Sequence, residues 1–407
     1  MYAMEKQRNQ QSLQKDLQEK NTVVSFLPKD IDIEITSFCN YRCAMCPHAL
    51  AGNTQASHLP PQVWEGLKPL LPYCKRVMLQ GDGEPLLYPH FKEMVEELAG
   101  YGAQICMTTN LSLLTEDLAG FLDRHFTLLT VSCDGGTPET YESIRRGGDF
   151  ARFAQNLQVL THHMDAGRIM VNTVVMRQNM RSLVPLLAFL KQSGIRQVMF
   201  SSLLTTNYLQ NEADTPMRYP HIASKMLEEA KAYADGNGIT LAVNWDYKIQ
   251  EDIPKERTEW ESLKKADQEA QSRIYTAKER QRFQEAYQRL HQVEKIREVA
   301  SGQYHCEGIC KNLYEKLYVD VSGNLTLCCF GKTKGVGNLL EDGLDGIWNG
   351  AVYQACRQAF FEGNLPDFCI GCRYAMLSSC QAVQAYPFHV ADMDQAFFDD
   401  EVFWENR

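Results

Sequence analysis

The sequence predicts an α/β protein, with a partial (β/α)6 TIM-like barrel followed by a small α+β domain at the C-terminal end. From residue 30 to about residue 202, six short strand-like runs alternate with amphipathic stretches. Such alternation is typical of parallel strands whose outer face is covered by helices. After residue 305, a hairpin-like segment and a concentration of cysteines replace this alternation.

The six expected strands are Ile31–Thr36, Arg76–Gln80, Gln104–Thr109, Leu128–Ser132, Ile169–Val175 and Gln197–Ser201. The clearest helices between them are Phe91–Leu98, Glu116–Arg124, Phe150–His162 and Leu183–Gln192. Beyond the sixth strand, Leu227–Ala234 is expected to be helical and Ile239–Val243 to be another strand. In folds of this kind the ligand site lies at the carboxyl ends of the strands.

Length and composition limit the classes of function. The 407 residues are too many for one ordinary domain, and the hydrophobic content of 44% allows a full core. The net charge of −10 argues against bulk nucleic-acid binding, which needs a local excess of Lys and Arg. The N-terminus is polar, and no apolar run approaches the roughly 20 residues that span a bilayer. We therefore expect a cytoplasmic protein without a membrane segment.

The chain divides into five predicted segments. They are a polar N-terminal lead-in (1–29), the barrel (30–202), a bridging helix and strand (203–246), a charged helical insertion (247–304) and a cysteine-rich domain (305–407). The lead-in is compatible with a helix or a disordered tail. In the insertion, Phe283, Tyr287, Leu290 and Ile296 recur near helical spacing, which predicts a helix that packs over the barrel, reaches a partner or is solvated.

A cysteine loop directly follows the first expected strand. Cys39, Cys43 and Cys46 have C-x3-C-x2-C spacing, and the chain has fourteen cysteines in total. Disulfides are rare in a reducing compartment, so the clustering of these thiols indicates metal binding. A structural zinc site uses four protein ligands, whereas three thiols can hold three irons of a cubane cluster and leave the fourth iron open for chemistry.

Polar and glycine-rich motifs follow the next strands. Gly81-Asp82-Gly83-Glu84-Pro85 follows the second strand, Thr108-Thr109-Asn110 ends the third, and Ser132 ends the fourth. The two glycines allow close approach of a ligand to the backbone, whose amides suit a carboxylate, while Asp82 and Glu84 suit an amine. A plain glycine-rich turn is the alternative, which the cysteine loop on the preceding strand disfavours.

Together these motifs resemble those of the radical S-adenosylmethionine (SAM) superfamily. The resemblance implies that Cys39, Cys43 and Cys46 bind a [4Fe–4S] cluster, and that the GDGEP loop contacts the methionine amino group of SAM. It assigns eight residues to the cofactor: Met45, Gly81, Asp82, Gly83, Glu84, Asn110, Ser132 and Arg146. Ser132 would contact the ribose, and Arg146, which fits the family pattern better than Arg145, would support the carboxylate. The family often has Gly where this chain has Leu111.

Two residues of the fourth strand end have alternative roles. Asp134 is either the N-cap of the following helix or a ligand contact. Cys133 is either a buried small hydrophobe or a catalytic hydrogen donor near the radical. His48, directly after the cysteine loop, either lines the site or is structural.

The last hundred residues contain a second set of thiols. Cys310 precedes an alternating run with Ser322-Gly323-Asn324 at its centre, which predicts a β-hairpin ending at Cys328. Cys369 and Cys372 form a C-x2-C pair. Four thiols make a closed site that by ligand count suits zinc or an iron–sulfur cluster.

The order of these cysteines with Gly337-Asn338-Leu339 and Ile347-Trp348-Asn349 resembles the SPASM/twitch extension of radical SAM enzymes. That resemblance implies an auxiliary [4Fe–4S] cluster on Cys310, Cys328, Cys369 and Cys372, with Cys329 as an alternative to Cys328. We expect one auxiliary cluster; two would also need ligands such as Cys306 and Cys380.

The resemblance implies a radical SAM oxidoreductase. A one-electron donor such as flavodoxin or ferredoxin reduces the first cluster, SAM is cleaved, and the resulting 5′-deoxyadenosyl radical takes hydrogen from a C–H bond. The substrate is expected to be small and polar, like a sugar or an aminocyclitol, because no N-terminal peptide-recognition domain is evident; a peptide or protein is the alternative. The same residues are also compatible with two other hypotheses. One is an enzyme that catalyses epimerisation or bond formation, and the other is a metal-stabilised binding protein.

Overall fold

The structure is a computed structural model of the chain. It describes residues 2–46, 48–49, 56–203, 214–244, 253–272, 278, 281, 285, 294–296, 298–305, 310, 312–327 and 334–369. Among these residues, no helix combines the length and the apolar character that crossing a membrane requires.

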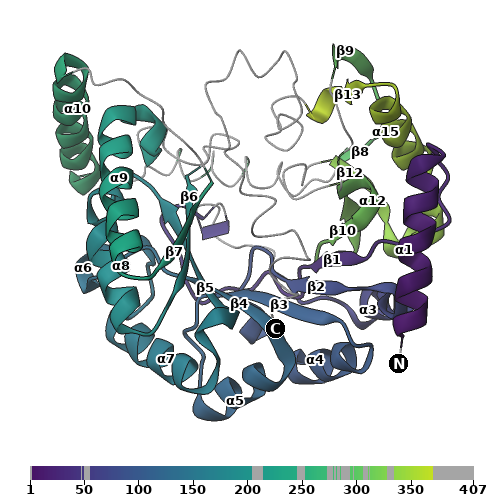
Figure 1. The fold of residues 1–407 in the computed structure, drawn as a ribbon, viewed down its shortest axis with the longest axis horizontal. Coiled ribbons are helices and arrows are strands. Elements are labelled where there is room, and N and C mark those ends of the chain that lie inside the picture. Colours follow the sequence, from purple (N-terminus) through teal and green to yellow (C-terminus); the bar gives the residue numbers. More distant parts are fainter. Residues whose placement is uncertain are drawn as a thin grey trace.

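Seven parallel strands form the main part of the sheet, in the order β7-β6-β5-β4-β3-β2-β1. Their bounds are β1 (Asp30–Ile33), β2 (Arg76–Leu79), β3 (Gln104–Thr109), β4 (Phe126–Ser132), β5 (Ile169–Val175), β6 (Gln197–Ser202) and β7 (Thr240–Val243). Figure 1 shows the sheet curving into an open arch with helices along its outer side. The predicted α/β class is confirmed, and β7, which lies where a further strand was expected at Ile239–Val243, extends the parallel sheet beyond the six barrel strands.

The helices of the barrel region are α3 (Pro61–Leu67), α4 (Phe91–Gly100), α5 (Glu116–His125), α6 (Pro138–Ile144), α7 (Phe150–His163), α8 (Leu183–Gln192) and α9 (Pro220–Gly236). Three of them begin at side-chain caps: Thr115 accepts a hydrogen bond from the Leu118 amide, Thr137 from Thr140 and Asp149 from Arg152. Such caps satisfy amides that have no partner within the helix. Because Thr137 caps α6, the predicted capping role of Asp134 was wrong.

The inner side of the sheet carries charged and polar side chains. Asp30 forms an ion pair with Arg76 (2.7 Å), and Asp32 contacts Lys316 (3.1 Å) and the Gln80 amide (2.9 Å). Burial raises the pKa of Asp32, and the Lys316 ammonium opposes that shift. Ile31 and Ile33 alternate with these aspartates and pack in the core.

The first predicted strand is shorter than expected. β1 ends at Ile33, and the chain then pairs with residues 57–59 instead: Leu59 donates its amide to Ile35 (2.9 Å), and Thr36 forms an isolated antiparallel bridge with His58. The cysteine loop therefore starts from a second, local pairing rather than from the sheet itself.

The C-terminal hairpin belongs to the same sheet. It consists of β10 (Lys316–Val319) and β11 (Asn324–Thr326), and it continues to β12 (Lys334–Asn338) and β8 (Glu294–Lys295). β10 pairs in parallel with β1, and the part of the chain that the structure describes thus contributes eleven strands to this sheet. The predicted hairpin is confirmed: Gly323 has φ +78° in the turn, and Asp320 accepts the amides of Ser322 and Asn324.

The other described elements of the C-terminal region include four short helices and two strands. These are α12 (Asn312–Glu315), α13 (Leu339–Asp342), α14 (Leu344–Trp348) and α15 (Ala351–Phe361), with a small second sheet of β9 (Ser301–His305) and β13 (Asn364–Pro366). Asn338 caps α13 through the Leu340 amide (3.0 Å) and also donates to the Ser322 carbonyl. The Gly-Asn-Leu motif thus connects the hairpin turn to the helices.

The N-terminal lead-in is ordered, so the disordered-tail alternative was wrong. Helix α1 (Ala3–Gln18) packs against the short 3-10 helix η1 (Lys68–Tyr73). We call residues 22–27 the N-terminal clasp. Val24 exchanges two hydrogen bonds with the Asn349 side chain (2.9 and 3.0 Å), and the Trp348 indole donates to Phe26 (2.9 Å). The Ile-Trp-Asn motif therefore ties the start of the chain to the C-terminal region.

Part of the charged insertion is the helix α10 (Ile253–Ser272), which packs on α9. Leu263 is fully buried, and Glu259 accepts the first amides of α9, from His221 (3.0 Å) and Ile222 (3.3 Å). Asp267 pairs with Arg177 and Arg181 after β5. This part of the insertion therefore packs over the barrel, which is one of the alternatives that the sequence predicted.

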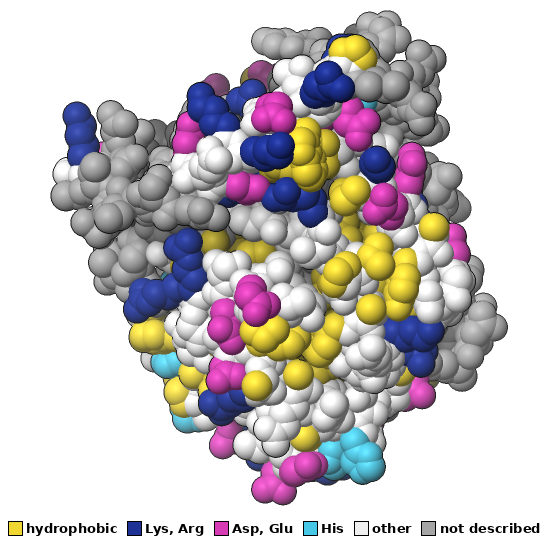
Figure 2. All heavy atoms as spheres, turned by 90° about the vertical axis from the view of Figure 1, so that its left-hand side faces the viewer, with side chains coloured by type: hydrophobic (Ala, Val, Ile, Leu, Met, Phe, Trp, Pro, Cys, Tyr) yellow, Lys and Arg dark blue, Asp and Glu magenta, His cyan; other side chains and the backbone are white. Residues whose placement is uncertain are grey.

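The predicted apolar stripe of the insertion has a different outcome. Phe283, Tyr287 and Leu290 lie outside the described residues, and Ile296 directly follows β8 rather than lying in a helix. Figure 2 shows the face where α6, α8 and α9 lie; charged side chains of both signs are interspersed there with hydrophobic ones.

We expect Asn349→Ala to weaken the attachment of the N-terminal clasp. The substitution removes both hydrogen bonds to Val24, each worth about 1 kcal/mol, so unfolding should cost about 2 kcal/mol less. Denaturant unfolding measures this change, and limited proteolysis should cut the clasp faster. Glu341→Ala, at an exposed position, is the control and should leave both measurements unchanged.

Candidate active site

The cysteine loop is held between the ends of β1 and α6. Arg42 donates its amide to the Arg146 carbonyl, and Ala44 donates to the Ile144 carbonyl, both at 2.8 Å. Cys43 is buried, whereas Cys39 and Cys46 are half-buried. Two backbone hydrogen bonds thus fix the loop around Cys43 independently of any ligand.

The three thiols of the cysteine loop are buried or half-buried, and sulfur ligands of this kind suit an iron–sulfur cluster. Burial raises the pKa of Cys39 to about 11, that of Cys46 to about 12, and that of Cys43. Iron binding offsets this cost because the metal stabilises the thiolate form. Among the described residues, no three His, Cys, Asp or Glu side chains converge on a single metal ion.

The glycines of the GDGEP loop allow neighbouring protein atoms to approach the backbone closely. A Cβ on Gly83 would lie 2.3 Å from the Thr36 carbonyl oxygen, and a Cβ on Gly81 would lie 2.3 Å from Glu34 Cγ. The loop amides also have protein partners: Asp82 donates to Glu34 (2.6 Å), and Glu84 donates to the Phe38 carbonyl (2.8 Å). Those two amides are therefore unavailable to a carboxylate, contrary to the expectation from the sequence.

Glu84 joins the second and third strand ends. It is 2% exposed, and its carboxylate accepts hydrogen bonds from the Thr109 hydroxyl and the Asn110 amide, both at 2.7 Å. Burial raises the pKa of Glu84 to about 7, although these donors favour the charged form. These contacts make Glu84 a residue that positions the loops, and its predicted contact with the SAM amine stays a prediction.

Asn110 extends this network to the cysteine loop. Its side chain donates to Asn40 (3.0 Å) and accepts from the Ser112 amide (2.9 Å). The next residue, Leu111, has φ +64° and is fully buried, with its carbonyl accepting from Asn156 (2.8 Å). The left-handed conformation that a Gly would adopt freely is thus kept by a leucine, whose burial offsets the strain.

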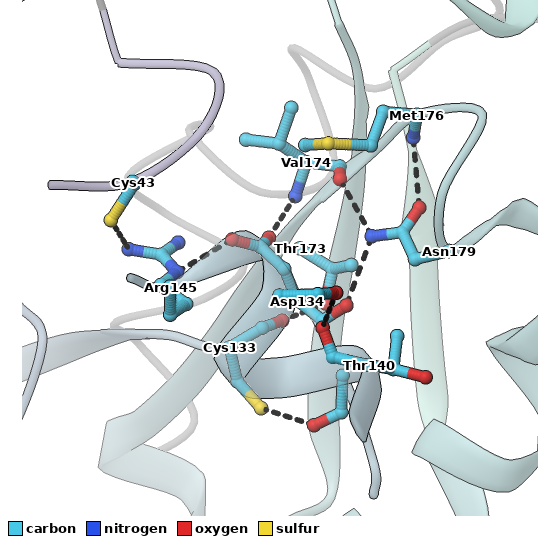
Figure 3. A network of polar contacts seen from close by, with 11 residues as sticks. Cys43, Cys133, Asp134, Thr140, Arg145, Thr173, Val174, Met176 and Asn179 are labelled. Carbon is cyan, nitrogen blue, oxygen red and sulfur yellow. Dashed lines mark hydrogen bonds and ion pairs between the residues drawn. The ribbon is translucent and has the colours of Figure 1, made fainter. Parts of the chain in front are cut away.

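A buried ion pair connects Cys43 to the ends of β4 and β5 (Figure 3). Arg145 Nε lies 2.5 Å from Asp134 Oδ2, and its Nη1 lies 3.8 Å from Cys43 Sγ. Asp134 Oδ1 accepts the Val174 amide (2.7 Å), while Asn179 donates to the Asp134 carbonyl (3.0 Å). Asp134 and Cys43 raise the pKa of Arg145 against the effect of burial, so its charge is retained.

Sequence reasoning did not find this role of Arg145. The structure buries Arg145 next to Cys43, whereas the Arg146 side chain, the predicted carboxylate contact, is exposed. The signal available in the sequence was an acidic residue after the fourth strand and an arginine at the end of the following helix. Only the folded chain brings the two charges together.

The structure places Cys133 away from the cysteine loop. It is fully buried, its thiol donates to the Gly135 carbonyl (3.3 Å), and burial raises its pKa to about 12. In Figure 3 its sulfur points away from Arg145 and Cys43. This placement favours the interpretation of Cys133 as a buried small hydrophobe.

Two further predicted cofactor-binding residues, Met45 and Ser132, lie among the described residues. Met45 packs against a small apolar cluster of Ile144, Met176 and Leu203, which is separate from the main core. Ser132 ends β4 with 9% exposure. The structure therefore brings both residues to the same edge of the sheet as the cysteine loop, as expected of strand ends.

Two of the four predicted auxiliary-cluster ligands are described. Cys310 and Cys369 are half-buried, and both pack against the main core. Cys310 precedes α12 and accepts the Leu313 amide at its carbonyl (3.1 Å). Cys328 and Cys372, and the alternatives Cys306, Cys329 and Cys380, lie outside the described residues.

Comparison with protein families agrees with this geometry. Residues 33–190 match the radical SAM superfamily, and residues 310–373 match the SPASM iron–sulfur cluster-binding domain. The chain is a radical SAM protein with a C-terminal SPASM domain. The family binds SAM and a [4Fe–4S] cluster, and the SPASM domain adds auxiliary iron–sulfur binding, as predicted.

Curated relatives of this radical SAM protein share part of its length. The AdoMet-dependent heme synthase of Methanosarcina barkeri is 26% identical over 170 residues, covering 41% of this chain and 48% of that protein. A tungsten-containing aldehyde ferredoxin oxidoreductase cofactor-modifying protein of Pyrococcus furiosus is 28% identical over 200 residues, covering 43% and 52%. The chain thus spans about half the length of these relatives.

Solved structures share the fold of this radical SAM protein over most of its length. Streptococcus suis SuiB superimposes with a TM-score of 0.56 at 16% identity, covering 86% of this chain and 72% of SuiB. The anSMEcpe structure with bound AdoMet gives a TM-score of 0.54 at 17% identity, covering 81% and 79%. At these identities the likeness shows a common fold.

We expect Leu111→Gly to be more stable than Leu111→Ala. Both lose the buried side chain, but only glycine adopts φ +64° without strain, which should favour it by about 1 kcal/mol. Leu98, buried in the helix α4, provides the control pair, where Gly should be the less stable substitution. Thermal or denaturant unfolding measures both pairs, and the same order at both sites would refute strain at Leu111.

We expect Gly83→Ala to disrupt the contact between the GDGEP loop and the cysteine loop. The new methyl would meet two backbone carbonyls, which cannot rotate away as a side chain can. Iron content after reconstitution and SAM binding by equilibrium dialysis should both fall. Gly100→Ala is the control, because its added Cβ has no atom within 4 Å. A Gly83→Ala protein with full iron and unchanged SAM affinity would contradict this account.

Proposed function

We propose that this chain is a radical SAM oxidoreductase that removes hydrogen from a C–H bond of a polar substrate. The observation that carries the proposal is the buried Arg145–Asp134 ion pair beside Cys43, in a cysteine loop that is hydrogen bonded to the end of β3 through Asn110 and to the GDGEP loop after β2 through Glu84. When bound, the reduced [4Fe–4S] cluster and SAM supply a 5′-deoxyadenosyl radical. The protein binds these groups, excludes water and positions the substrate.

Cys39, Cys43 and Cys46 are the proposed cluster ligands. Arg145 places a positive charge 3.8 Å from Cys43 Sγ, which stabilises the thiolate form of that ligand. Asp134 keeps the guanidinium in place, and its own carboxylate is held by the Val174 amide. We therefore assign Arg145 a positioning and charge-balancing role, and retain Arg146 as the candidate contact for the SAM carboxylate.

The GDGEP loop is the proposed binding site of the SAM amino group. The amides of Asp82 and Glu84 donate to protein acceptors, so neither serves a ligand, whereas the carbonyl oxygens and the Asp82 carboxylate of this stretch are acceptors. Such acceptors suit an ammonium group rather than a carboxylate. Glu84 and Asn110 hold this loop against the next strand and the cysteine loop.

The inner face of the sheet supports a polar substrate. Gln80, Thr108, Asn172 and Ser201 are half-exposed on this face, and Ser201 donates to Asn172 (3.0 Å) while Thr108 donates to Gln80 (3.2 Å). Hydroxyl and amide groups of this kind match the hydroxyls of a sugar-like substrate. Oxidation also requires an electron acceptor, which is the role we assign to the SPASM domain and its auxiliary cluster.

A peptide substrate is the second candidate. Structures of SuiB bound to the precursor peptide SuiA and of anSMEcpe with a bound peptide share the fold of this chain, with TM-scores of 0.56 and 0.53. Peptide amides would pair with the same glutamine and asparagine side chains.

The central test is SAM cleavage by purified, anaerobically reconstituted protein. With dithionite, the protein should release 5′-deoxyadenosine, and Cys43→Ala should abolish the release because one cluster ligand is lost. Cys74→Ala, which removes a buried thiol at the other end of β2, is the control and should retain cleavage. One auxiliary cluster predicts about eight irons per chain and two predict about twelve. Cleavage by the Cys43→Ala protein would refute the assigned site.

A further inference from the structure

Arg357 is a buried cation in the C-terminal region. It belongs to α15, is 0% exposed, and donates to the Thr22 carbonyl (3.0 Å), the Leu313 carbonyl (3.4 Å) and Asn349 Oδ1 (3.4 Å). All three acceptors are neutral. The guanidinium also lies over three aromatic rings, at 4.8 Å from Trp348, 5.1 Å from Tyr353 and 5.6 Å from Tyr314.

No carboxylate pairs with Arg357 among the residues that the structure describes. Asp16 acts on Arg357 electrostatically without forming an ion pair with it. The Asp16 carboxylate accepts hydrogen bonds from Ser25 and Asn21 instead. Burial therefore lowers the pKa of Arg357 to about 10. An isolated charge in the interior is costly, and proteins ordinarily place an opposite charge beside it.

The predicted auxiliary-cluster ligand Cys310 is linked to this cation through Leu313. Arg357 donates to the Leu313 carbonyl, and the Leu313 amide donates to the Cys310 carbonyl (3.1 Å), so one residue touches both. Arg357 and Cys310 both act electrostatically on the Cys356 thiol and the Tyr314 hydroxyl. A negative group bound at Cys310 would thus lie within range of the guanidinium.

We propose that Arg357 is the counter-charge of the auxiliary iron–sulfur cluster and raises its reduction potential. The inference rests on the proposed function, in which Cys310 is a cluster ligand. A cluster held by four thiolates is an anion, and its potential depends on net charge, hydrogen bonding and exposure. Each electron that the cluster accepts adds one negative charge, which a nearby buried cation stabilises. Arg357 therefore makes the cluster a better acceptor for the electron taken from the substrate.

The test is a redox titration of the auxiliary cluster by itself. In a Cys39→Ala/Cys43→Ala/Cys46→Ala background only this cluster is retained, and electron paramagnetic resonance follows its reduction. Arg357→Met should lower the midpoint potential by at least the equivalent of a tenfold change in the reduction equilibrium, ~59 mV for one electron. Arg357→Lys, which keeps the charge, should stay closer to the parent protein than Arg357→Met.

Asn9→Ala is the matched control for a purely structural role. Asn9 exchanges two 2.8 Å hydrogen bonds with Leu27 and does not contact Arg357, so its loss should lower thermal stability and leave the potential unchanged. If Arg357→Met fails to fold, Arg357→Gln removes the charge and keeps a donor for the carbonyls. An unchanged potential in a folded, cluster-containing neutral variant would overturn the proposal. Absence of iron from the triple-alanine background would instead overturn the proposed auxiliary site.

Discussion

The pairing of β1 with a strand on each side is the constraint on which the rest of the structure depends. β1 hydrogen bonds in parallel to β2 on one edge and to β10 on the other. The cysteine loop follows β1, the GDGEP loop follows β2, and the hairpin of the SPASM domain begins with β10. A single four-residue strand thus sets the positions of the SAM site and the auxiliary-cluster domain relative to each other.

Glu34, directly after β1, strengthens this relation. One carboxylate oxygen accepts the Asp82 amide of the GDGEP loop (2.6 Å), and the other accepts the Val321 amide of the hairpin turn (3.4 Å). Its side chain also occupies the space that a Cβ on Gly81 would need. The N-terminal clasp, which precedes β1 in the chain, contacts the SPASM domain through Asn349 and Trp348. Both sets of contacts join residues that are far apart in the sequence. Together they hold the N-terminal part of the chain and the SPASM domain in one packed unit.

The two candidate sites handle buried charge differently. Arg145 near Cys43 has Asp134 as a partner, so its charge is balanced before any cluster binds. Arg357 near Cys310 has only neutral acceptors and aromatic rings among the described residues. The potential of an iron–sulfur centre responds to nearby charge. The paired charge of Arg145 favours a role in binding at the first site. The unpaired charge of Arg357 favours an effect on the potential of the auxiliary cluster.

The sequence by itself determined the class of fold, the order of the parallel strands and the positions of the cysteine and glycine motifs, because these depend on local periodicity and on spacing along the chain. β3, β5 and α8 have the predicted bounds, since their apolar patterns end at clear turn residues. Tertiary structure alone decided that Gly81 and Gly83 accommodate protein atoms, that Leu111 adopts a glycine-like conformation, and that Arg145 rather than Arg146 lies beside Cys43. It also decided that β10 joins β1 and that the N-terminal helix is ordered. Each of these outcomes depends on contacts between residues distant in sequence, whose energies have no local signature in the chain.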